Sequence, residues 1–298
     1  MKTVTDSYCG LVAIVGRPNV GKSTLLNRML GQKISITSRK PQTTRYRLLG
    51  VSTEGNRQLI FVDTPGWQRA PRSRLNRSMN REMQGALDGV DVVLMLADAR
   101  GWQEDDDAVL RIAAERDAPL ILALNKIDLL TDKAALLPMI QQLQARHDFA
   151  EVIPLSARAE KDPETVVATV GRYLPPAPFQ FGADDVTDRS ERFLAGETVR
   201  EKLMRLLGDE LPYATSVVVD AFEDEPGMTL ISVTIWVERP GQKAIVIGKK
   251  GEMLKRIGTE ARLDLERLLG RKVAIKTWVK VKESWSDDAR ALRTLGLD

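Results

Sequence analysis

The chain has very little cysteine and histidine, the residues on which disulfide, zinc and imidazole chemistry depend. Its 298 residues include one cysteine, Cys9, and one histidine, His147. A single cysteine excludes a disulfide framework and a four-cysteine zinc site. A single histidine argues against multi-histidine metal sites and histidine-based catalysis. Because the chain has no disulfide to keep oxidised, we expect it in a reducing cytoplasm.

Long apolar runs are missing as well. The longest obvious run, Val92 to Ala97, is much shorter than the roughly 18 residues needed to span a bilayer, and residues 1–7 lack the apolar core of a signal peptide. Peripheral contact with the inner face of the cell membrane is the one membrane association left open. The chain is 43% hydrophobic and 29% charged, which is ordinary for a globular protein, and its length suits about two domains.

The most informative motif is a glycine-rich loop directly after the apolar stretch Leu11 to Val15. It matches G-x-x-x-x-G-K-S, and we expect nucleotide contacts from Gly16, Arg17, Pro18, Asn19, Val20, Gly21, Lys22, Ser23 and Thr24. Such a loop points successive N–H groups at phosphate oxygens, and the helix that begins near Lys22 directs its positive end at the same anion. Lys22 adds a charge, and Ser23 offers a hydroxyl to Mg²⁺. A tight turn alone would not require the Lys-Ser pair, so the motif predicts a phosphate-binding loop.

A second motif, Asn125-Lys126-Ile127-Asp128, predicts which base is bound. It follows the apolar run Leu120 to Leu124, which predicts a buried strand, and the carboxyl ends of such strands are where doubly wound folds bind ligands. The carboxylate of Asp128 can accept two hydrogen bonds from guanine, whereas adenine lacks that pair of donors. Because sites built on such bonds can reject an analogue that lacks them by roughly 10⁴, we predict a guanine nucleotide.

A third segment, Asp63-Thr64-Pro65-Gly66, follows the predicted strand Gln58 to Val62. An acidic residue at this place can hold a Mg²⁺-bound water. The N–H of Gly66 can bond the γ-phosphate only while that phosphate is present, so the segment after it has a physical reason to change conformation on hydrolysis.

Two weaker segments complete the predicted nucleotide site. In the polar stretch Pro41 to Arg45, one threonine hydroxyl can complete the Mg²⁺ shell, and we favour Thr44 over Thr43. Ser156 and Ala157 follow a short apolar run and can present backbone N–H groups to the guanine carbonyl.

These five segments occur in the order and approximate spacing of the small GTPase fold, and the first half of the chain resembles a translation-factor-type GTPase. The resemblance implies GTP and GDP as ligands and Mg²⁺ as the metal, held by Ser23, Thr44 and Asp63. It assigns catalysis to Lys22, Thr44, Asp63 and Gly66.

Two positions in this half bear on turnover. Trp67 stands where Ras-type enzymes carry the glutamine that orients the attacking water, so we expect low intrinsic GTP hydrolysis. Asn19 stands where some related families have an asparagine that coordinates K⁺; the alternative is that its side chain bonds the loop's own backbone.

A proline-rich stretch, Leu174 to Pro178, ends the first domain. We predict a nucleotide-binding domain over residues 1–178, a linker over 179–190 and a second domain over 191–298. Before the stretch, strands and helices alternate as a doubly wound α/β domain with a mixed, mostly parallel sheet requires, and the turn Glu54 to Asn56 makes one edge pair antiparallel.

The second domain has an α+β pattern. The sequence predicts helices over Glu197 to Leu207 and Glu252 to Leu269, and strands over Ser216 to Phe222, Leu230 to Glu238 and Lys272 to Val281. The second helix places five apolar residues on one face, which predicts the core: Leu254, Ile257, Ala261, Leu265 and Leu268.

A G-x-x-G loop in this domain predicts binding of a polyanion. We expect the loop to lie between a short strand and the helix that begins at Glu252, and its candidate RNA-binding residues are Ile247, Gly248, Lys249, Lys250, Gly251 and Lys255. From Lys243 to Lys282 there are twelve Lys and Arg against four Asp and Glu, a formal charge of +8, whereas the whole chain carries +3. Two glycines allow close approach of a sugar-phosphate backbone, and the lysines supply affinity without reading sequence.

Together, the motif order, this loop and the tail Trp278 to Asp288 resemble the Era family of bacterial GTPases over nearly the entire chain. The resemblance implies a type II KH domain that binds single-stranded RNA near the 3′ end of 16S rRNA, with roles in rRNA processing, assembly of the 30S ribosomal subunit and a link to cell-cycle control. It also implies a monomer.

Two other functions stay open on the sequence alone. One is an RNA-binding protein that uses guanine nucleotide as a structural ligand, which Trp67 favours. The other is a membrane-peripheral signalling GTPase whose basic surface meets anionic lipid. Among these functions, the resemblance favours ribosome assembly.

Overall fold

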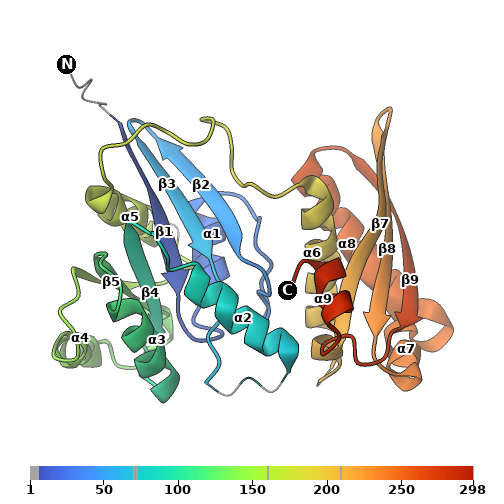
Figure 1. The fold of residues 1–298 in the computed structure, drawn as a ribbon, viewed down its shortest axis with the longest axis horizontal. Helices are drawn as coiled ribbons and strands as arrows, with labels where there is room; N and C mark the ends of the chain where they lie inside the picture. The colour runs from blue at the N-terminus through green and yellow to red at the C-terminus, as the bar shows by residue number, and fades with distance from the viewer. Residues whose placement is uncertain (1–6, 70, 72, 160, 209, 298) are drawn as a thin grey trace. The chain divides into compact units, whose positions relative to one another are not determined.

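The structure is a computed structural model that describes residues 7–69, 71, 73–159, 161–208 and 210–297 (Figure 1). These residues form two compact units. The first holds the chain through Ser35, then Thr44–Pro71 and Met79–Asp188. The second holds Ile36–Thr43, Arg72–Ser78 and the chain from Arg189 onward. Two short segments of the N-terminal half therefore group with the C-terminal unit, and the predicted domain limits at 178 and 191 stay a prediction.

The first unit is an α/β domain built on a six-stranded sheet. Its elements are β1 (Tyr8–Val15), α1 (Lys22–Met29), β2 (Leu48–Glu54), β3 (Arg57–Asp63), α2 (Arg74–Gly85), β4 (Val92–Asp98), α3 (Glu104–Ala114), β5 (Leu120–Asn125), α4 (Leu136–Gln144), β6 (Glu151–Leu155) and α5 (Asp162–Val170). The first turn of α2 groups with the second unit.

The sheet has the order β2-β3-β1-β4-β5-β6, and only the edge pair β2–β3 is antiparallel. This confirms the predicted mixed, mostly parallel sheet and its antiparallel edge. Every residue of β4 is buried, as expected of a central strand covered on both faces. Because the parallel strands all end at one edge, the loops that follow β1, β3, β4, β5 and β6 meet there.

The second unit is an α+β domain with a three-stranded sheet. Its elements are α6 (Glu191–Leu206), β7 (Thr215–Glu225), β8 (Met228–Val237), α7 (Pro240–Ile247), α8 (Glu252–Leu269), β9 (Lys272–Val281) and α9 (Ala289–Leu295). Strands β7 and β8 form an antiparallel hairpin, and β9 pairs in parallel with β8 as an edge strand.

The core of this unit lies between one face of the sheet and helices α6 and α8. The predicted apolar face of α8 is confirmed: Ile257, Ala261 and Leu265 are fully buried and pack in one cluster with Val199 of α6 and Val233 of β8. Leu254 and Leu268, the other two predicted core residues, are partly buried against the same cluster.

One sequence-based expectation was wrong. The residues before the G-x-x-G loop form helix α7 rather than a short strand. Pro240 fits the first helical turn because its missing N–H has no partner there in any case, and Gln242 Oε1 accepts hydrogen bonds from the backbone N–H groups of Glu238 and Arg239 at 2.8 and 3.0 Å. These local signals outweigh the β-branched run Ile245 to Ile247.

Across the described part of the chain, no helix combines the length and the apolar character that a membrane crossing requires.

The packing of α8 gives a first testable prediction. Replacing the fully buried Leu265 by alanine should lower the free energy of unfolding by about 2–5 kcal/mol, because it removes buried methyl groups and leaves a cavity. Leu263→Ala on the same helix is the matched control, since that side chain is 40% exposed, and it should change the free energy by no more than about 0.5 kcal/mol. Urea unfolding measures both, and equal losses would contradict the assigned core face.

Candidate functional site

The glycine-rich loop turns sharply at the end of β1, and two of its glycines permit the turn. Gly16 has φ 151° and Gly21 has φ 109°, in the region that favours glycine. A Cβ at Gly16 would lie 2.5 Å from the carbonyl oxygen of Leu96, and one at Gly21 would lie 2.3 Å from Asn125 Nδ2. No other residue fits either position without displacing its neighbour.

Lys22 begins helix α1 and is buried beneath the loop. Its Nζ donates hydrogen bonds to the carbonyl oxygens of Gly16 at 2.9 Å and Arg17 at 3.1 Å. Burial, opposed by the attraction of Asp63 and aided by the nearby Arg17, lowers the pKa of Lys22 to about 8. A phosphate group beside this ammonium would favour its charged form, so the residue fits an anion site.

Three predicted metal ligands converge next to this lysine. The Ser23 Oγ lies 2.8 Å from the Thr44 Oγ1 and donates to Asp63 Oδ2 at 2.9 Å. Ser35, which the sequence analysis missed, also donates to Asp63 Oδ2, at 2.8 Å. These hydroxyl and carboxylate oxygens are the donors that Mg²⁺ prefers.

The carboxylate of Asp63 gives a second reason to assign a cation here. It is fully buried, and its Oδ1 has no hydrogen-bond partner among the described residues. Burial raises the pKa of Asp63, while Lys22 and the hydroxyls of Ser35 and Ser23 oppose that rise. Because a buried oxygen without a partner is costly, a cation at this point would satisfy it. The residues present therefore fit Mg²⁺.

The structure separates the two candidate threonines. Thr44 lies beside Ser23, whereas the hydroxyl of Thr43 lies 2.6 Å from Ser38 Oγ and donates to the Lys40 carbonyl at 2.8 Å. The geometry supports the choice of Thr44 over Thr43, which stays a prediction.

The segment after β3 lies against the glycine-rich loop. A Cβ on Gly66 would come within 2.8 Å of the Pro18 backbone nitrogen, so Gly66 can sit this close only without a side chain. Thr64 Oγ1 donates to the Ile14 carbonyl at 2.8 Å, which anchors the start of the segment to β1. Trp67 packs against the core cluster of the sheet, and its indole provides no base for water.

The predicted base-binding motif is held by hydrogen bonds of Asn125 and Lys126. Asn125 Nδ2 donates to the Val20 carbonyl at 2.7 Å, which joins this motif to the glycine-rich loop. Lys126 Nζ donates to the Asn19 carbonyl at 2.5 Å and to Asp98 Oδ2 at 2.9 Å. Asp128 is exposed at the surface, where an incoming base can reach its carboxylate.

Asp98 is a site residue that the sequence analysis missed. It ends β4, and the signal was its place directly after the apolar run Val92 to Ala97. Burial by itself would raise the pKa of its carboxyl, but hydrogen bonds from Arg100 and Lys126 hold that pKa well below its usual range. Asp98 therefore stays charged and orients the ammonium of Lys126.

The amides of Ser156 and Ala157, predicted to face a guanine carbonyl, already have partners within the protein. The Ala157 N–H donates to Asn125 Oδ1 at 2.9 Å, and the Ser156 N–H donates to Asp162 Oδ2 at 2.6 Å. A contact with a guanine carbonyl would require one of these bonds to open, so this assignment stays a prediction.

The G-x-x-G loop joins α7 to α8 within the second unit. Gly248 and Gly251 have φ 75° and 82°, and Lys250 between them also has a positive φ of 52°. A Cβ on Gly248 would lie 2.7 Å from the Cβ of Met253, so the first glycine is required by close packing. Among the described residues, none forms an ion pair with Lys249, Lys250 or Lys255, and all three are exposed.

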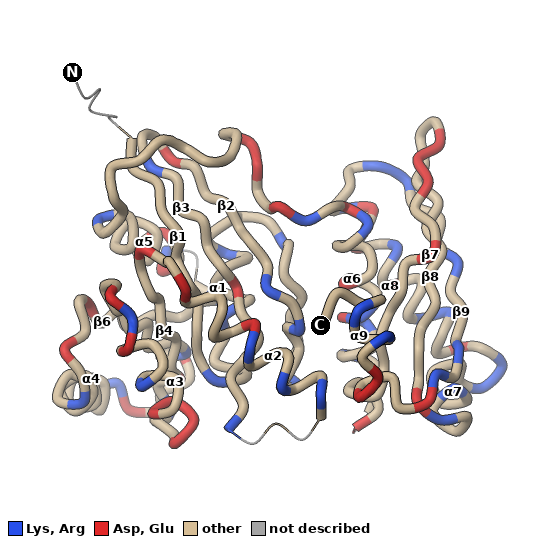
Figure 2. Tube along the Cα trace, in the orientation of Figure 1, with Lys and Arg blue, Asp and Glu red and all other residues tan. Residues whose placement is uncertain are grey.

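Positive charge gathers on one side of this unit. Figure 2 shows Lys and Arg around α7 and along β9, with acidic residues at the tip of the β7–β8 hairpin. This agrees with the charge excess counted from the sequence between Lys243 and Lys282. Exposed lysines beside a loop that admits close backbone approach are the features expected of an RNA-binding surface.

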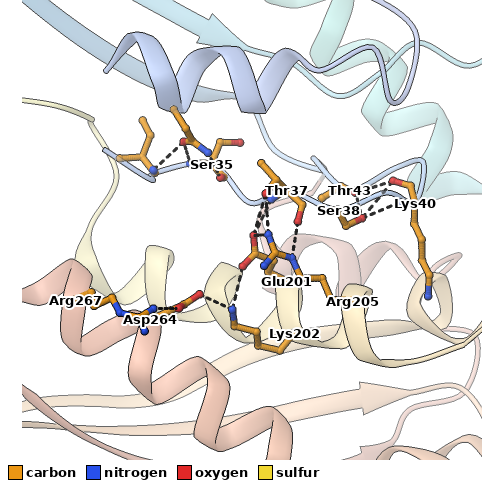
Figure 3. A network of polar contacts seen from close by, with 12 residues as sticks. Ser35, Thr37, Ser38, Lys40, Thr43, Glu201, Lys202, Arg205, Asp264 and Arg267 are labelled. Carbon is orange, nitrogen blue, oxygen red and sulfur yellow. Dashed lines mark hydrogen bonds and ion pairs between the residues drawn. The ribbon is translucent and has the colours of Figure 1, made fainter. Parts of the chain in front are cut away.

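A buried polar network, also in the second unit, holds the segment Ile36–Thr43 (Figure 3). Glu201 of α6 is fully buried, and its Oε1 accepts from the Thr37 backbone N–H at 2.9 Å. Arg205 donates to the Thr37 carbonyl oxygen and hydroxyl, each at 2.9 Å, and pairs with Glu201 at 3.0 Å.

The network continues to α8. The buried Lys202 pairs with Glu201 Oε2 at 3.3 Å and with Asp264 Oδ2, and Arg267 donates to Asp264 Oδ1 at 2.8 Å (Figure 3). Sequence analysis missed these residues because their helical spacing resembles that of an ordinary solvated face. Separating these buried partners would leave a charge uncompensated, so the pairing favours one arrangement of the side chains.

The threonine assignment is testable. Thr44→Ala should weaken the Mg²⁺-dependent part of the affinity for a GTP analogue by about tenfold, because it removes one oxygen from the charged cluster. Thr43→Ala is the matched control and should leave the Mg²⁺ dependence unchanged. Titration calorimetry with and without Mg²⁺ measures both variants, and a larger effect from Thr43→Ala would reverse the assignment.

Comparison with known proteins agrees with this geometry. Residues 11–126 match the family model described as 50S ribosome-binding GTPase, and residues 210–286 match a KH domain. The chain is 51% identical over 298 residues to the GTPase Era of Stenotrophomonas maltophilia strain R551-3, with 100% of each chain covered. It is 50% identical over 296 residues to that of Xanthomonas oryzae pv. oryzae strain MAFF 311018, with 99% of each covered.

Two solved structures match over almost the whole chain. A crystal structure of Era in complex with MgGDPNP and nucleotides 1506–1542 of 16S ribosomal RNA has a TM-score of 0.93 and 40% identity, and covers 98% of this chain and 99% of that one. A variant of Aquifex aeolicus Era bound to GDP.AlF4- has a TM-score of 0.93 and 39% identity, with 97% and 99% covered. With a match to a GTPase model, a match to a KH domain and 51% identity to a relative covered over its whole length, this protein belongs to the Era family of GTPases.

Proposed function

We propose that this GTPase binds GTP with Mg²⁺ at the glycine-rich loop, binds the 3′ region of 16S rRNA through its KH domain, and acts in rRNA processing and biogenesis of the 30S subunit. The observation that carries the proposal is the presence of both candidate sites in one chain, 98% of which matches a structure that holds both ligands. The convergence of Ser23, Thr44 and Asp63 supports the metal assignment.

Different residues bind different parts of the nucleotide. Loop N–H groups and Lys22 bind the phosphates, and Asp128 selects the base by accepting hydrogen bonds that adenine cannot donate. When bound, Mg²⁺ neutralises charge on the phosphates. Gly66 would donate its backbone N–H to the γ-phosphate. Because Trp67 provides no base and packs into the core, the chain itself contributes little to orienting water, and we expect slow turnover without a partner.

The segment Ile36–Thr43 supplies a physical path from nucleotide to RNA. Its residues are bonded to α6, and Glu201 and Lys202 connect that contact to α8, the helix that follows the G-x-x-G loop. The next residue along the chain is Thr44, at the metal site. A change at Thr44 between the GTP and GDP states would act on a covalently continuous segment whose other residues are bonded to a network with buried charges, which resists intermediate positions.

The function is tested by the affinity of the protein for a single-stranded RNA that matches the 3′ end of 16S rRNA, compared with a scrambled RNA. We expect tighter, sequence-selective binding with a non-hydrolysable GTP analogue than with GDP. Lys22→Ala should abolish the difference between the two nucleotides because it removes a phosphate contact. Equal, salt-sensitive binding to both RNAs in both states would reject the proposal and leave only general polyanion binding.

The path is tested by Arg205→Gln. This variant removes the side chain that donates to Thr37, so the ratio of RNA affinities in the GTP and GDP states should fall toward one while GDP affinity stays unchanged. Arg290→Gln on α9 is the matched control, because it removes one positive charge outside the network and should preserve the ratio. Circular dichroism checks that the variant is folded. If folded Arg205→Gln kept the wild-type ratio of RNA affinities in the GTP and GDP states, this path would be excluded.

Other assignments remain proposals. We place the protein in the cytoplasm as a monomer, with peripheral membrane association as the alternative that liposome flotation would test. K⁺ coordination by Asn19 also stays a proposal; the residue has a positive φ of 64° and its carbonyl accepts from Lys126. Hydrolysis measured in potassium and in sodium buffers would test it.

A further inference from the structure

Strand β9 has two different faces. On one face, Val273 and Val279 are buried in the core cluster with α6 and α8. On the other face, Lys276, Trp278 and Lys280 are exposed. Because β9 is the edge strand of the sheet and its side chains alternate, these three residues project together from the face opposite the helices.

Trp278 stands between two lysines with its indole open to solvent. It is 51% exposed, and the lysines two residues before and after it lie about 7 Å away along the strand. None of the described residues forms an ion pair with Lys276 or Lys280. On β8, Thr234 pairs in register with Trp278, and its hydroxyl donates to Asp220 of β7 at 2.7 Å.

A tryptophan on the neighbouring strand β8 differs from Trp278 in its exposure and in its partner. Trp236 of β8 pairs in register with Lys280 and is only 8% exposed. The Nζ of Lys282 lies 3.8 Å from the centre of its ring, so a cation of the protein already covers that indole. In contrast, the ring of Trp278 has no cation–π partner among the described residues.

Lysines on an edge strand have a simple structural explanation, because charge there prevents pairing with other sheets. An exposed indole on the same strand has the opposite effect, because exposed aromatic surface favours association with other molecules. Edge protection therefore explains Lys276 and Lys280 but leaves Trp278 unexplained. A stacking ring flanked by cations is instead the arrangement that proteins use for single-stranded nucleic acid.

We propose that the outer face of β9 binds a second stretch of single-stranded RNA, with a base stacked on Trp278 and phosphates beside Lys276 and Lys280. This rests on the proposed RNA binding by the KH domain. A G-x-x-G loop clamps about four nucleotides, whereas the RNA in the related complex spans nucleotides 1506–1542. Helix α7, which leads into the loop, packs against β9, so RNA that leaves the loop can continue onto this strand.

The test compares a short RNA, about six nucleotides and long enough only for the loop, with a single-stranded RNA that extends it by about ten nucleotides. Trp278→Ala should weaken binding of the long RNA about tenfold, the loss expected for one stacked base, and leave the short RNA unchanged. Trp278→Phe should restore most of the affinity because it keeps an aromatic face. The double variant Lys276→Gln/Lys280→Gln should lower the salt dependence of long-RNA binding by about two phosphate contacts.

Two controls separate the outcomes. Arg290→Gln removes one charge elsewhere in the unit and should leave both RNAs bound as before. Lys249→Gln/Lys250→Gln in the loop should weaken the binding of both RNAs, which would show that the G-x-x-G loop contributes to RNA affinity.

Unchanged long-RNA affinity in Trp278→Ala, or equal losses of affinity for both RNAs, would overturn the β9 proposal alone. Loss of binding to the 30S subunit with RNA affinities unchanged would also overturn it, by assigning the face to a protein. If the wild-type chain binds neither RNA, the proposed function fails with it.

Discussion

The nucleotide site depends on one constraint, the common direction of five parallel strands. Since β1, β3, β4, β5 and β6 end at the same edge of the sheet, the residues that follow them meet although they are far apart in sequence. Asn125 shows the result most directly: it bonds to Val20 in the first loop and to Ala157 in the last. A shift in the order of these strands would disperse the site without altering any single motif.

Buried charge sets the local geometry at both ends of the proposed nucleotide–RNA path. At the proposed Mg²⁺ site, two serine hydroxyls donate to the buried carboxylate of Asp63, and its other oxygen has no hydrogen-bond partner among the described residues. In the second unit, Glu201 and Lys202 are buried as a pair and fix Thr37 and Asp264. In both places, the cost of leaving a buried charge alone restricts the chain to a few well-defined arrangements.

Sequence reasoning worked best where a motif carries its own chemistry. The glycine-rich loop follows β1, the side chains of Ser23, Thr44 and Asp63 lie together, and the α8 core face is buried, as their spacing predicted. It failed before the G-x-x-G loop, where β-branched residues suggested a strand while Pro240 and Gln242 started a helix. Capping bonds are formed between side chains and backbone over three or four residues, so apolar periodicity does not report them.

The sequence by itself determined the motifs and the family that they define: a glycine-rich loop, an N-K-x-D segment and a basic G-x-x-G loop. Those motifs are local, because each needs only a few adjacent residues and a strand or helix beside them. Tertiary structure alone decided that Ser35 donates to Asp63, that Asp98 orients Lys126, that Glu201 accepts from the Thr37 N–H, and that Trp278 rather than Trp236 is exposed. These depend on long-range packing and desolvation, which bring together residues whose separation in sequence carries no signal.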